Sequence, residues 1–375
     1  MPTPANTAAW LDAPFATLKV RPAPYSSPGP DQIVVRNRAI AVNPLDRIKQ
    51  STGNLMYRWL PYPSVLGEDV AGEVVEVGSN VTRFRVGDRV LAYAVGMEKN
   101  RNHAAEGGFQ LFTVVQSQLA AALPDNLSFA DGVVLPLAIS TAASALFQRD
   151  QLSLRHPVPR VSAPASSAGQ SVLVWGGSTS VGLNAIQLAV AAGYRVVATA
   201  SPHNHDLLRS LGASDVFDYR DISEITTALG NNDVAGILSI GTGSAEQCVA
   251  IAAAVGAKRV AMTSMPVSLS GLPQRVGLSL GLVSLGLKMV GSNLALQLTC
   301  LRHGIRARFV WGSTLMSNEV GPQLWGEFLP AALAEGSYVS APRAHVVGSG
   351  LASLQGALEA LDAGVSARKL VVTLD

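Results

Sequence analysis

The chain has 375 residues and a mass of 39.0 kDa, more than one ordinary domain, so we predict two. Apolar residues make up 48% and charged residues only 14%, which argues against intrinsic disorder. The formal charge of +2 gives no electrostatic reason to expect nucleic acid or anionic lipid as a partner.

The first twenty residues lack a basic region followed by an apolar core, so we expect no secretory signal. The longest apolar stretches are interrupted before they reach the roughly 20 residues that span a bilayer. Two cysteines, Cys248 and Cys300, are too few for a disulfide framework or a thiolate zinc site. We therefore expect a cytoplasmic protein without a membrane span.

The first third of the chain is typical of a small, barrel-like β domain, because short apolar segments alternate with glycine-containing turns. The predicted strands are Gln32 to Ala41, Val70 to Val77, Arg89 to Tyr93 and Phe109 to Val115. The pattern then changes: Ser128 can cap a helix, and the apolar run from Val133 to Phe147 predicts a buried one. Residues 151–170 have the composition of an exposed loop.

From Ser171 onward, strands and helices alternate, which predicts parallel βαβ units in a doubly wound sheet. The predicted strands are Val172 to Trp175, Arg195 to Ala200, Asp215 to Phe217, Val234 to Ile240, Arg259 to Thr263 and Phe309 to Gly312. The predicted helices between them are Val181 to Ala192, Asn204 to Leu211, and one that Ser244 caps and that runs to Ala254. The tail adds helices around Leu324 to Leu333 and Leu351 to Leu361 and strands at His345 to Val347 and Leu370 to Leu374. We expect it to return to the first domain.

The most informative motif is a strand that runs through glycines into a helix, Val172 to Gly182. Glycine lets the backbone turn tightly and approach a pyrophosphate, whose charge the free N–H groups at the helix N-terminus stabilise. Because the strand–turn–helix context is present, we predict a dinucleotide site rather than an empty structural turn. The residues expected to bind there are Gly176, Gly177, Ser178, Thr179, Ser180 and Val181.

The end of the next predicted strand distinguishes NAD from NADP. An acidic side chain there accepts from the ribose 2′-hydroxyl of NAD and would repel the 2′-phosphate of NADP. This chain has neutral or basic donors instead, so we predict NADPH; the donors are Ser201, His203, Asn204 and, after the third strand, Tyr219. The alternative for His203 and His205 is a solvated helix cap, and no third ligand accompanies them at metal spacing.

Together with Gly67 to Gly78 and Phe84 to Val90, these motifs resemble the medium-chain dehydrogenase/reductase superfamily over nearly the whole chain. The resemblance implies an α/β protein with a mostly-β GroES-like substrate domain made of residues 1–137 and 320–375. It further implies a doubly wound Rossmann domain at 138–319 that binds NADPH, with the active site in the cleft between the two. Further cofactor contacts are expected at Asp46, Arg47, Ile240, Thr263 and Lys369.

Zinc-dependent members of that superfamily carry a histidine where this chain has Glu68, a cysteine where it has Asn43, and another cysteine near Leu137. The four-cysteine loop of a structural zinc site is also missing. Without thiolate or imidazole ligands a tetrahedral zinc site cannot be assembled, so we predict no metal. Zinc-assisted alcohol oxidation is then disfavoured, whereas reduction of an activated carbon–carbon double bond needs no metal.

Within the zinc-free branch, the chain resembles fungal trans-acting enoyl reductases of polyketide biosynthesis, of the lovastatin-pathway type. The motifs that carry this resemblance are Asn43 to Asp46, Ala138 to Ala142, Gly176 to Thr179, Ser201 to Asn204 and Val216 to Arg220. It implies hydride transfer from NADPH to the β-carbon of an enoyl thioester on a polyketide synthase carrier domain, followed by protonation of the enolate. The alternatives are a quinone or enone oxidoreductase acting on a small hydrophobic substrate, and an inactive cofactor-binding partner of a synthase.

Candidate groups for stabilising the enolate or supplying the proton are Lys49, Tyr57, Ser140 and Thr141. Relatives often place a lysine where this chain has Ile48, and here the lysine is displaced to Lys49. If the loop is a turn, Lys49 can instead be a surface lysine, leaving Tyr57, Tyr62, water or the cofactor ribose as the proton source. Tyr57 can equally be a packing residue, and the two hydroxyls can bond within their own helix.

Two further segments raise the question of a partner or a substrate. The loop Glu98 to His103 has a basic surplus that could meet an acidic carrier domain, although such a run is usually a solvated face. The apolar stretch from Val276 to Leu298 follows the fifth strand, where a hydrophobic acyl substrate could be received.

Overall fold

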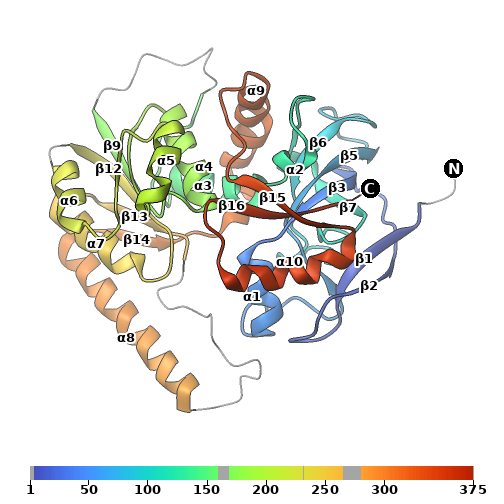
Figure 1. Cartoon of the computed structure of the whole chain (residues 1–375), viewed down its shortest axis with the longest axis horizontal. Coiled ribbons are helices and arrows are strands. Elements are labelled where there is room, and N and C mark those ends of the chain that lie inside the picture. The colour runs from blue at the N-terminus through green and yellow to red at the C-terminus, as the bar shows by residue number, and fades with distance from the viewer. Residues whose placement is uncertain (1–3, 159–168, 231, 265–279, 375) are drawn as a thin grey trace. The chain divides into compact units, whose positions relative to one another are not determined.

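The computed structural model describes residues 4–158, 169–230, 232–264 and 280–374, and it divides into two compact units (Figure 1). Unit 1 comprises Met1–Leu137 and Gly321–Asp375, and unit 2 comprises Ala138–Val320. Part of the predicted loop at 151–170 and the first residues of the apolar stretch at 276–298 lie outside the described residues.

Unit 1 is framed by a mixed sheet whose strands are β3 (Gln32–Ala41), β5 (Asp69–Val77), β6 (Arg89–Tyr93), β7 (Phe112–Gln116), β8 (Ala120–Ala122), β15 (Arg343–Ser349) and β16 (Arg368–Thr373). Their order is β15–β16–β3–β5–β6–β8, with β7 also paired to β3. Neighbours are antiparallel except β15 and β16. A smaller antiparallel sheet has the order β2 (Lys19–Ala23), β1 (Asn6–Leu11), β4 (Ser64–Val65).

The core of this mixed sheet follows the alternation of strand side chains. Ile33 and Val35 of β3 lie in one buried cluster with Val70 and Val74 of β5. Gly72 lies where β5 approaches β3 closely: a Cβ there would come 2.0 Å from the carbonyl oxygen of Arg36. The predicted strands at 32–41 and 89–93 are confirmed residue for residue, whereas β7 begins three residues later than predicted and β1 and β2 were not predicted.

Helix α1 (Pro44–Thr52) occupies the segment for which a turn was considered. The Asn43 amide donates to Asp46 Oδ2 at 2.8 Å, and Pro44 sits in the first turn, where a missing N–H costs nothing. Ser128 caps α2 (Phe129–Gly132) as predicted, since its Oγ accepts from the Asp131 amide at 3.1 Å. The other helical segments of unit 1 are η1 (Ser117–Leu119), the π-helix η5 (Pro322–Phe328), α9 (Leu329–Ala334), η6 (Leu351–Ser353), α10 (Leu354–Ala360) and η7 (Leu361–Ala363).

Unit 2 contains a parallel sheet of the strands β9 (Gln170–Trp175), β10 (Arg195–Thr199), β11 (Asp215–Phe217), β12 (Asp233–Ser239), β13 (Arg259–Met262) and β14 (Arg306–Phe309). The strand order is β11–β10–β9–β12–β13–β14. The chain moves outward from β9 to one edge of the sheet and then returns to build the other half from β12, which confirms the predicted doubly wound α/β fold. The last strand begins three residues before the predicted Phe309.

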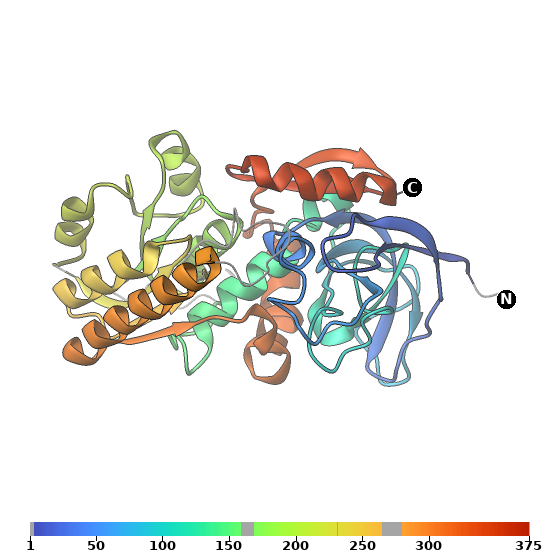
Figure 2. The ribbon, with the colours of Figure 1, turned by 90° about the horizontal axis from the view of Figure 1, so that it is seen from below.

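The helical segments of unit 2 are α3 (Pro136–Phe147), α4 (Ser180–Ala191), η3 (Pro202–Asn204), α5 (His205–Ser210), α6 (Ile222–Gly230), α7 (Ser244–Val255), α8 (Leu280–His303) and η4 (Gly312–Ser317). The prediction that Ser244 caps α7 is wrong: Gly243 is the cap, with φ of 75°, and Ser244 is the first helical residue. Helix α6 was not predicted. Figure 2 shows the long helix α8, whose C-terminal end lies next to the start of β14.

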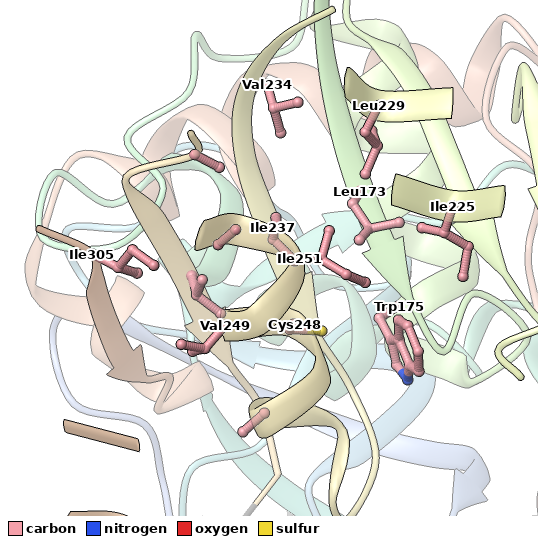
Figure 3. Close-up of a cluster of buried hydrophobic side chains, with 14 of the residues drawn as sticks. Leu173, Trp175, Ile225, Leu229, Val234, Ile237, Cys248, Val249, Ile251 and Ile305 are labelled. Carbon is pink, nitrogen blue, oxygen red and sulfur yellow. The ribbon is translucent and has the colours of Figure 1, made fainter. Parts of the chain in front are cut away.

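The core of unit 2 lies where α7 covers the sheet (Figure 3). Leu173 and Ile237 of neighbouring strands pack with Cys248 and Ile251 of the helix. Because both faces of a parallel sheet are covered, near-continuous apolar strands are expected. The apolar segment Phe129–Phe147 has the length and hydropathy of a membrane helix. It consists of two separate helices, α2 and α3, and it is largely buried in the fold.

Candidate functional site

The turn between β9 and α4 has the geometry expected of a phosphate-binding loop. Gly176 has φ of 81°, and a Cβ there would lie 2.7 Å from the carbonyl oxygen of Ile240. At Gly182 a Cβ would lie 2.4 Å from the Gly176 carbonyl oxygen. Thr179 is exposed and caps α4, since its Oγ1 accepts from the Gly182 amide at 3.0 Å. The helix N-terminus therefore presents backbone N–H groups at the end of a buried strand.

The predicted 2′-phosphate donors follow the neighbouring strands at the same edge of the sheet. The Gly176 amide donates to Thr199 Oγ1 at 3.1 Å, and this bond ties the ends of β9 and β10 together. Ser201 is half-buried and His203 exposed directly after β10, and Tyr219 is 43% exposed after β11. The structure describes no carboxylate at residues 200–204.

Three side chains refine this group of donors. Asn204 is buried, and its Nδ2 lies 3.2 Å from His203 Nε2. The His205 ring lies 3.1 Å from the Ala200 carbonyl oxygen, and His205 is the first residue of α5, whose N-cap is Asn204. Arg220, which the sequence analysis did not single out, lies over the Tyr219 ring and pairs with Asp218 at 3.0 Å. An arginine directly after a tyrosine at a strand end was the available signal.

Ile240 and Thr263 follow the carboxyl ends of β12 and β13 and complete this edge. The Ile240 amide donates to the Trp175 carbonyl oxygen at 3.1 Å, and the Thr263 amide donates to that of Ser239 at 3.0 Å. The residues brought together at the edge are thus Gly176 to Val181, Ser201, His203, Asn204, Tyr219, Ile240 and Thr263.

Ser140 and Thr141 lie on α3. The Ser140 side chain is fully buried, and its Oγ has no hydrogen-bond partner among the described residues, so the structure does not show the intrahelical bond considered for it. Thr141 is half-buried and packs against Gly312: a Cβ added at Gly312 would lie 2.6 Å from Thr141 Oγ1. A buried hydroxyl with unused hydrogen-bonding capacity is costly unless a further group binds it.

The remaining predicted residues lie in unit 1, around a buried ion pair. Lys369 Nζ lies 2.8 Å from Asp69 Oδ2, and both side chains are buried. Asn43 Nδ2 donates to the same oxygen at 2.9 Å, while the Leu137 amide donates to Oδ1 at 2.6 Å. Lys369 also bonds to Asn43 Oδ1. The structure thus gives Lys369 two acceptors within the protein, and its contact with the cofactor stays a prediction.

Asp46 is fully buried beside this pair. Its Oδ2 accepts from the Asn43 amide at 2.8 Å and its Oδ1 from the Gly67 amide at 3.0 Å, so it anchors the start of α1. Burial, followed by the negative charge of Asp69, raises the pKa of Asp46 to about 7 against the lowering effect of those two amides. Its predicted role toward the cofactor remains untested.

Glu68 is a buried acid that the sequence analysis treated only as a missing metal ligand. It is 2% exposed; its Oε1 lies 3.5 Å from the Tyr93 hydroxyl, and its Oε2 has no hydrogen-bond partner in the described part of the chain. Burial, then the charges of Asp46 and Glu98, raise its pKa well above the ordinary value. A neutral carboxyl donates a hydrogen bond as well as accepting one. Two adjacent acids at the start of an apolar strand were the signal for this cluster.

Lys49 is fully buried, so the expectation of a surface lysine is wrong. Because its segment is a helix and not a turn, Nζ points inward and donates to the carbonyl oxygens of Gly53 and Tyr57, both at 3.1 Å. It also lies 4.6 Å from the Tyr62 ring centroid, and burial lowers its pKa to about 8. Tyr57 is 2% exposed and packs edge-on against Trp59, as its packing alternative requires. The chemical roles of both residues stay predictions.

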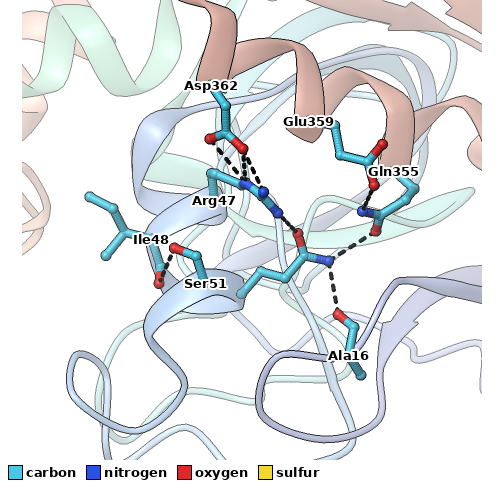
Figure 4. Close-up of polar contacts among 8 residues, drawn as sticks. Ala16, Arg47, Ile48, Ser51, Gln355, Glu359 and Asp362 are labelled. Carbon is cyan, nitrogen blue, oxygen red and sulfur yellow. Dashed lines mark hydrogen bonds and ion pairs between the residues drawn. The ribbon is translucent and has the colours of Figure 1, made fainter. Parts of the chain in front are cut away.

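Arg47 is bound to an acidic group of its own unit (Figure 4). Its Nε lies 3.1 and 3.2 Å from the two oxygens of Asp362, and Nη1 donates to Gln50 Oε1 at 2.7 Å. Gln50 in turn bonds to Gln355 and to the Ala16 carbonyl oxygen, both at 2.9 Å. Contact with a cofactor phosphate would require Arg47 to exchange one anion for another.

In the described ranges, no three histidine, cysteine, aspartate or glutamate side chains are grouped so that they could hold a metal ion. The cluster around Asp69 contains carboxyl, amide and amine groups, with neither thiolate nor imidazole.

Comparisons with known proteins agree with this architecture. Residues 29–125 match the family model "Alcohol dehydrogenase GroES-like domain". The chain is 47% identical to "Dehydrogenase pigH" of Monascus ruber, covering 99% of this chain and 100% of the relative, and 38% identical to "Trans-enoyl reductase himH" of Aspergillus japonicus, covering 98% and 97%. Among solved structures, the CurK enoyl reductase is similar with a TM-score of 0.71 and 19% identity, covering 99% of both chains, which bears on the fold alone.

Proposed function

Because the chain belongs to the medium-chain dehydrogenase/reductase superfamily, together with fungal dehydrogenases and trans-enoyl reductases, we propose that it is an NADPH-dependent enoyl reductase. Its substrate is the activated double bond of an enoyl thioester carried by a polyketide synthase. Enzymes of this superfamily are oxidoreductases that bind a nicotinamide cofactor, and the choice of NADPH and of a polyketide substrate is the proposal.

The edge of unit 2 is the observation that carries the proposal. The pyrophosphate of NADPH would bind at the turn after β9, whose glycines allow close backbone packing and where the start of α4 offers N–H groups. Ser201, His203, Tyr219 and Arg220 would hold the 2′-phosphate, because they offer hydroxyl, imidazole and guanidinium donors. Bound NADPH supplies a hydride.

The chain's own task is then to stabilise the negative charge that develops on the thioester oxygen. The unpartnered hydroxyl of Ser140 is the group we assign to that oxygen, with Thr141 beside it. The protonated carboxyl of Glu68 and the ammonium of Lys49 are groups of unit 1 that can hold a proton for the α-carbon. None of these steps requires a metal ion.

The test is the loss of NADPH absorbance with a free enoyl thioester of N-acetylcysteamine as substrate. We expect turnover with NADPH and much less with NADH, and little turnover with quinones. Reaction with quinones but with no enoyl thioester would replace the proposal by the quinone or enone reductase. Absence of hydride transfer in a single-turnover experiment with both substrate classes would identify an inactive cofactor-binding partner instead.

A matched set of variants tests the cofactor assignment. Tyr219→Phe and Arg220→Ala should raise the KM for NADPH and leave that for NADH unchanged, because NADH lacks the 2′-phosphate. The control Arg209→Ala removes another exposed arginine, which pairs with Asp206 at 3.2 Å, and should change neither constant. Equal effects on both cofactors would argue against a 2′-phosphate site at this edge.

A further inference from the structure

The charges of this chain are unevenly distributed along the sequence. Residues 247–318 contain seven lysines and arginines and neither aspartate nor glutamate, so the rest of the chain carries 21 basic against 26 acidic residues. A segment of 72 residues with one sign of charge, inside a chain of net charge +2, creates a local field that the overall composition conceals.

The fold concentrates this charge at the end of α8 and on β14. We define the basic edge as Lys258, Arg302, His303, Arg306 and Arg308, all of which are exposed. The Arg306 amide donates to the Lys258 carbonyl oxygen at 2.8 Å, and Lys258 Nζ donates to the His303 carbonyl oxygen at 3.1 Å. These bonds hold the end of α8, the start of β14 and the residue before β13 side by side.

Most of these cations have no acidic partner. Arg308 lies 3.3 Å from Asp150, whereas the structure, over its described residues, gives Lys258, Arg302 and Arg306 no carboxylate within ion-pair distance. The loop Glu98 to His103, considered from the sequence as a basic contact but more typical of a solvated face, is different. There Arg101 is bound at 2.6 and 2.7 Å to the two oxygens of Glu106, and the His103 ring contacts the Gly96 carbonyl oxygen. In that loop only Lys99 is an exposed cation without an ion pair to the described residues, so the unpaired positive charge of the described chain is denser at the basic edge.

Apolar side chains lie beside the basic edge. Leu294, Leu298 and Leu301 recur at intervals of four and three residues on α8, so they share a helix face, and they are 60%, 58% and 78% exposed. Phe309, at the end of β14, is 41% exposed. Figure 2 shows that the C-terminal end of α8 lies next to the start of β14. Exposed leucines next to arginines are typical of a protein interface, where apolar contacts lie within a polar rim.

The edge strand determines which class of partner fits. Among the strands that the structure describes, β14 is the last of its sheet and pairs with β13 alone, so its outer side can take a further strand. Nucleic acid and lipid offer no such strand. In a symmetric antiparallel pairing of β14 with a second copy, Arg306 and Arg308 of the two chains would come together, and like charges on neighbouring strands are destabilising.

We propose that the basic edge, with the leucine face of α8, docks an acidic protein surface on the synthase whose carrier-bound intermediate the enzyme reduces; the identity of this partner rests on the proposed function. Arginine forks bind carboxylates in a bidentate way, which suits an acidic protein surface. Because all strands of the sheet are parallel, the start of β14 lies at the end opposite to the turn after β9. Docking here leaves the cofactor edge free, and the contact tethers the partner without closing the site.

The binding test uses the full-length enzyme and the charge reversal Arg302→Glu/Arg306→Glu. The control Arg85→Glu/Arg209→Glu makes the same change of charge at arginines whose side chains are 90% and 52% exposed elsewhere. The probe is fluorescent poly-L-glutamate, with a DNA duplex and phosphatidylserine vesicles as anions of other classes. We expect the reversal to weaken polyglutamate binding about tenfold or more, with an effect that salt reduces, and the control to bind as the wild type does.

Three results would overturn the proposal: equal polyglutamate binding by all three proteins, tighter binding of DNA or vesicles that the reversal abolishes, or a change from dimer to monomer in the reversal by sedimentation velocity. Activity separates this proposal from the proposed function. All three proteins should reduce the free thioester equally, whereas the KM for the same acyl group on its synthase should rise about tenfold in the reversal alone. Failure with the free thioester contradicts the proposed function and leaves the binding result standing, while an unchanged KM on the synthase contradicts the docking surface.

Discussion

We expect removal of the Ser140 hydroxyl and removal of the Ser144 hydroxyl to have opposite effects on stability and on activity. Both are fully buried and lie one turn apart on α3. Ser144 Oγ donates to the Gly312 carbonyl oxygen at 3.1 Å, whereas Ser140 Oγ has no partner among the described residues. If the Ser140 hydroxyl binds the developing charge of the substrate, its removal should lower the catalytic rate without lowering the stability of the fold.

The magnitudes follow from these bonds. Ser140→Ala removes a buried, unsatisfied hydroxyl, so the free energy of unfolding should stay the same or rise by about 1 kcal/mol. Loss of a donor to the developing oxyanion should lower kcat about 100-fold or more. Ser144→Ala removes a satisfied hydrogen bond and should lower the free energy of unfolding by about 1 kcal/mol, with kcat unchanged.

Urea unfolding followed by circular dichroism measures the first quantity, and NADPH oxidation with a free enoyl thioester measures the second. A double variant should combine both effects, because the two hydroxyls share no partner. The reasoning is refuted if Ser140→Ala is destabilising by 1 kcal/mol or more while kcat is retained, a threshold of about one ordinary hydrogen bond. That outcome would make Ser140 a structural residue.

Three further predictions concern the buried charges and the glycine turn. Gly176→Ala places a Cβ 2.7 Å from the Ile240 carbonyl oxygen at a φ of 81°, so the Kd for NADPH measured by fluorescence should rise at least about tenfold, whereas Gly230→Ala, with open space around it, should not change it. Lys369→Met leaves the Asp69 carboxylate buried without its counter-charge and should lower the urea-measured stability by about 3–5 kcal/mol. The pair Asp69→Asn/Lys369→Met should lose less, and equal losses would argue against coupling. For Glu68 the folded pKa is raised, so the unfolded chain releases its proton first and the wild type loses stability as pH rises from about 4.3 toward the folded pKa. Glu68→Gln should flatten that loss in urea midpoints taken between about pH 5 and 9, and a profile identical to the wild type would show that Glu68 is ionised in the folded protein.

The strands and helices with a strong local pattern were predictable. Strand 32–41 has two apolar runs and is bounded by turn residues, and the glycine turn after Trp175 has its strand and helix on either side. Strands β1 and β2 were not predicted, and β1 takes its place through pairing with β2 and with β4, which is distant in sequence. The cap of α7 was placed one residue late because a glycine at φ of 75° can cap a helix without any side-chain bond.

The site in unit 1 was harder to predict because its chemistry depends on burial. Lysine is usually a surface residue, yet the helical conformation of this segment directs Lys49 Nζ toward the carbonyl oxygens of Gly53 and Tyr57. Nothing in the local sequence distinguishes Glu68, whose Oε2 is unpartnered in the described chain, from Asp69, which is paired with Lys369. That difference arises from residues about 300 positions apart, and only the folded chain brings them together.

The charge balance of this cluster bears on the chemistry proposed. Asp46, Glu68 and Asp69 are all buried, and the buried cation Lys369 pairs with Asp69. Because several ionised carboxylates cannot share one counter-charge in a low-dielectric interior, the proton goes to the carboxyl with the fewest hydrogen-bond donors, which is Glu68. A carboxyl must lose its proton before it can bind a metal ion, so a raised pKa opposes metal binding at Glu68. The same proton makes Glu68 a hydrogen-bond donor. We therefore predict that the position to which the resemblance assigns a zinc ligand carries a proton donor here, as a metal-free reduction of an activated double bond would use.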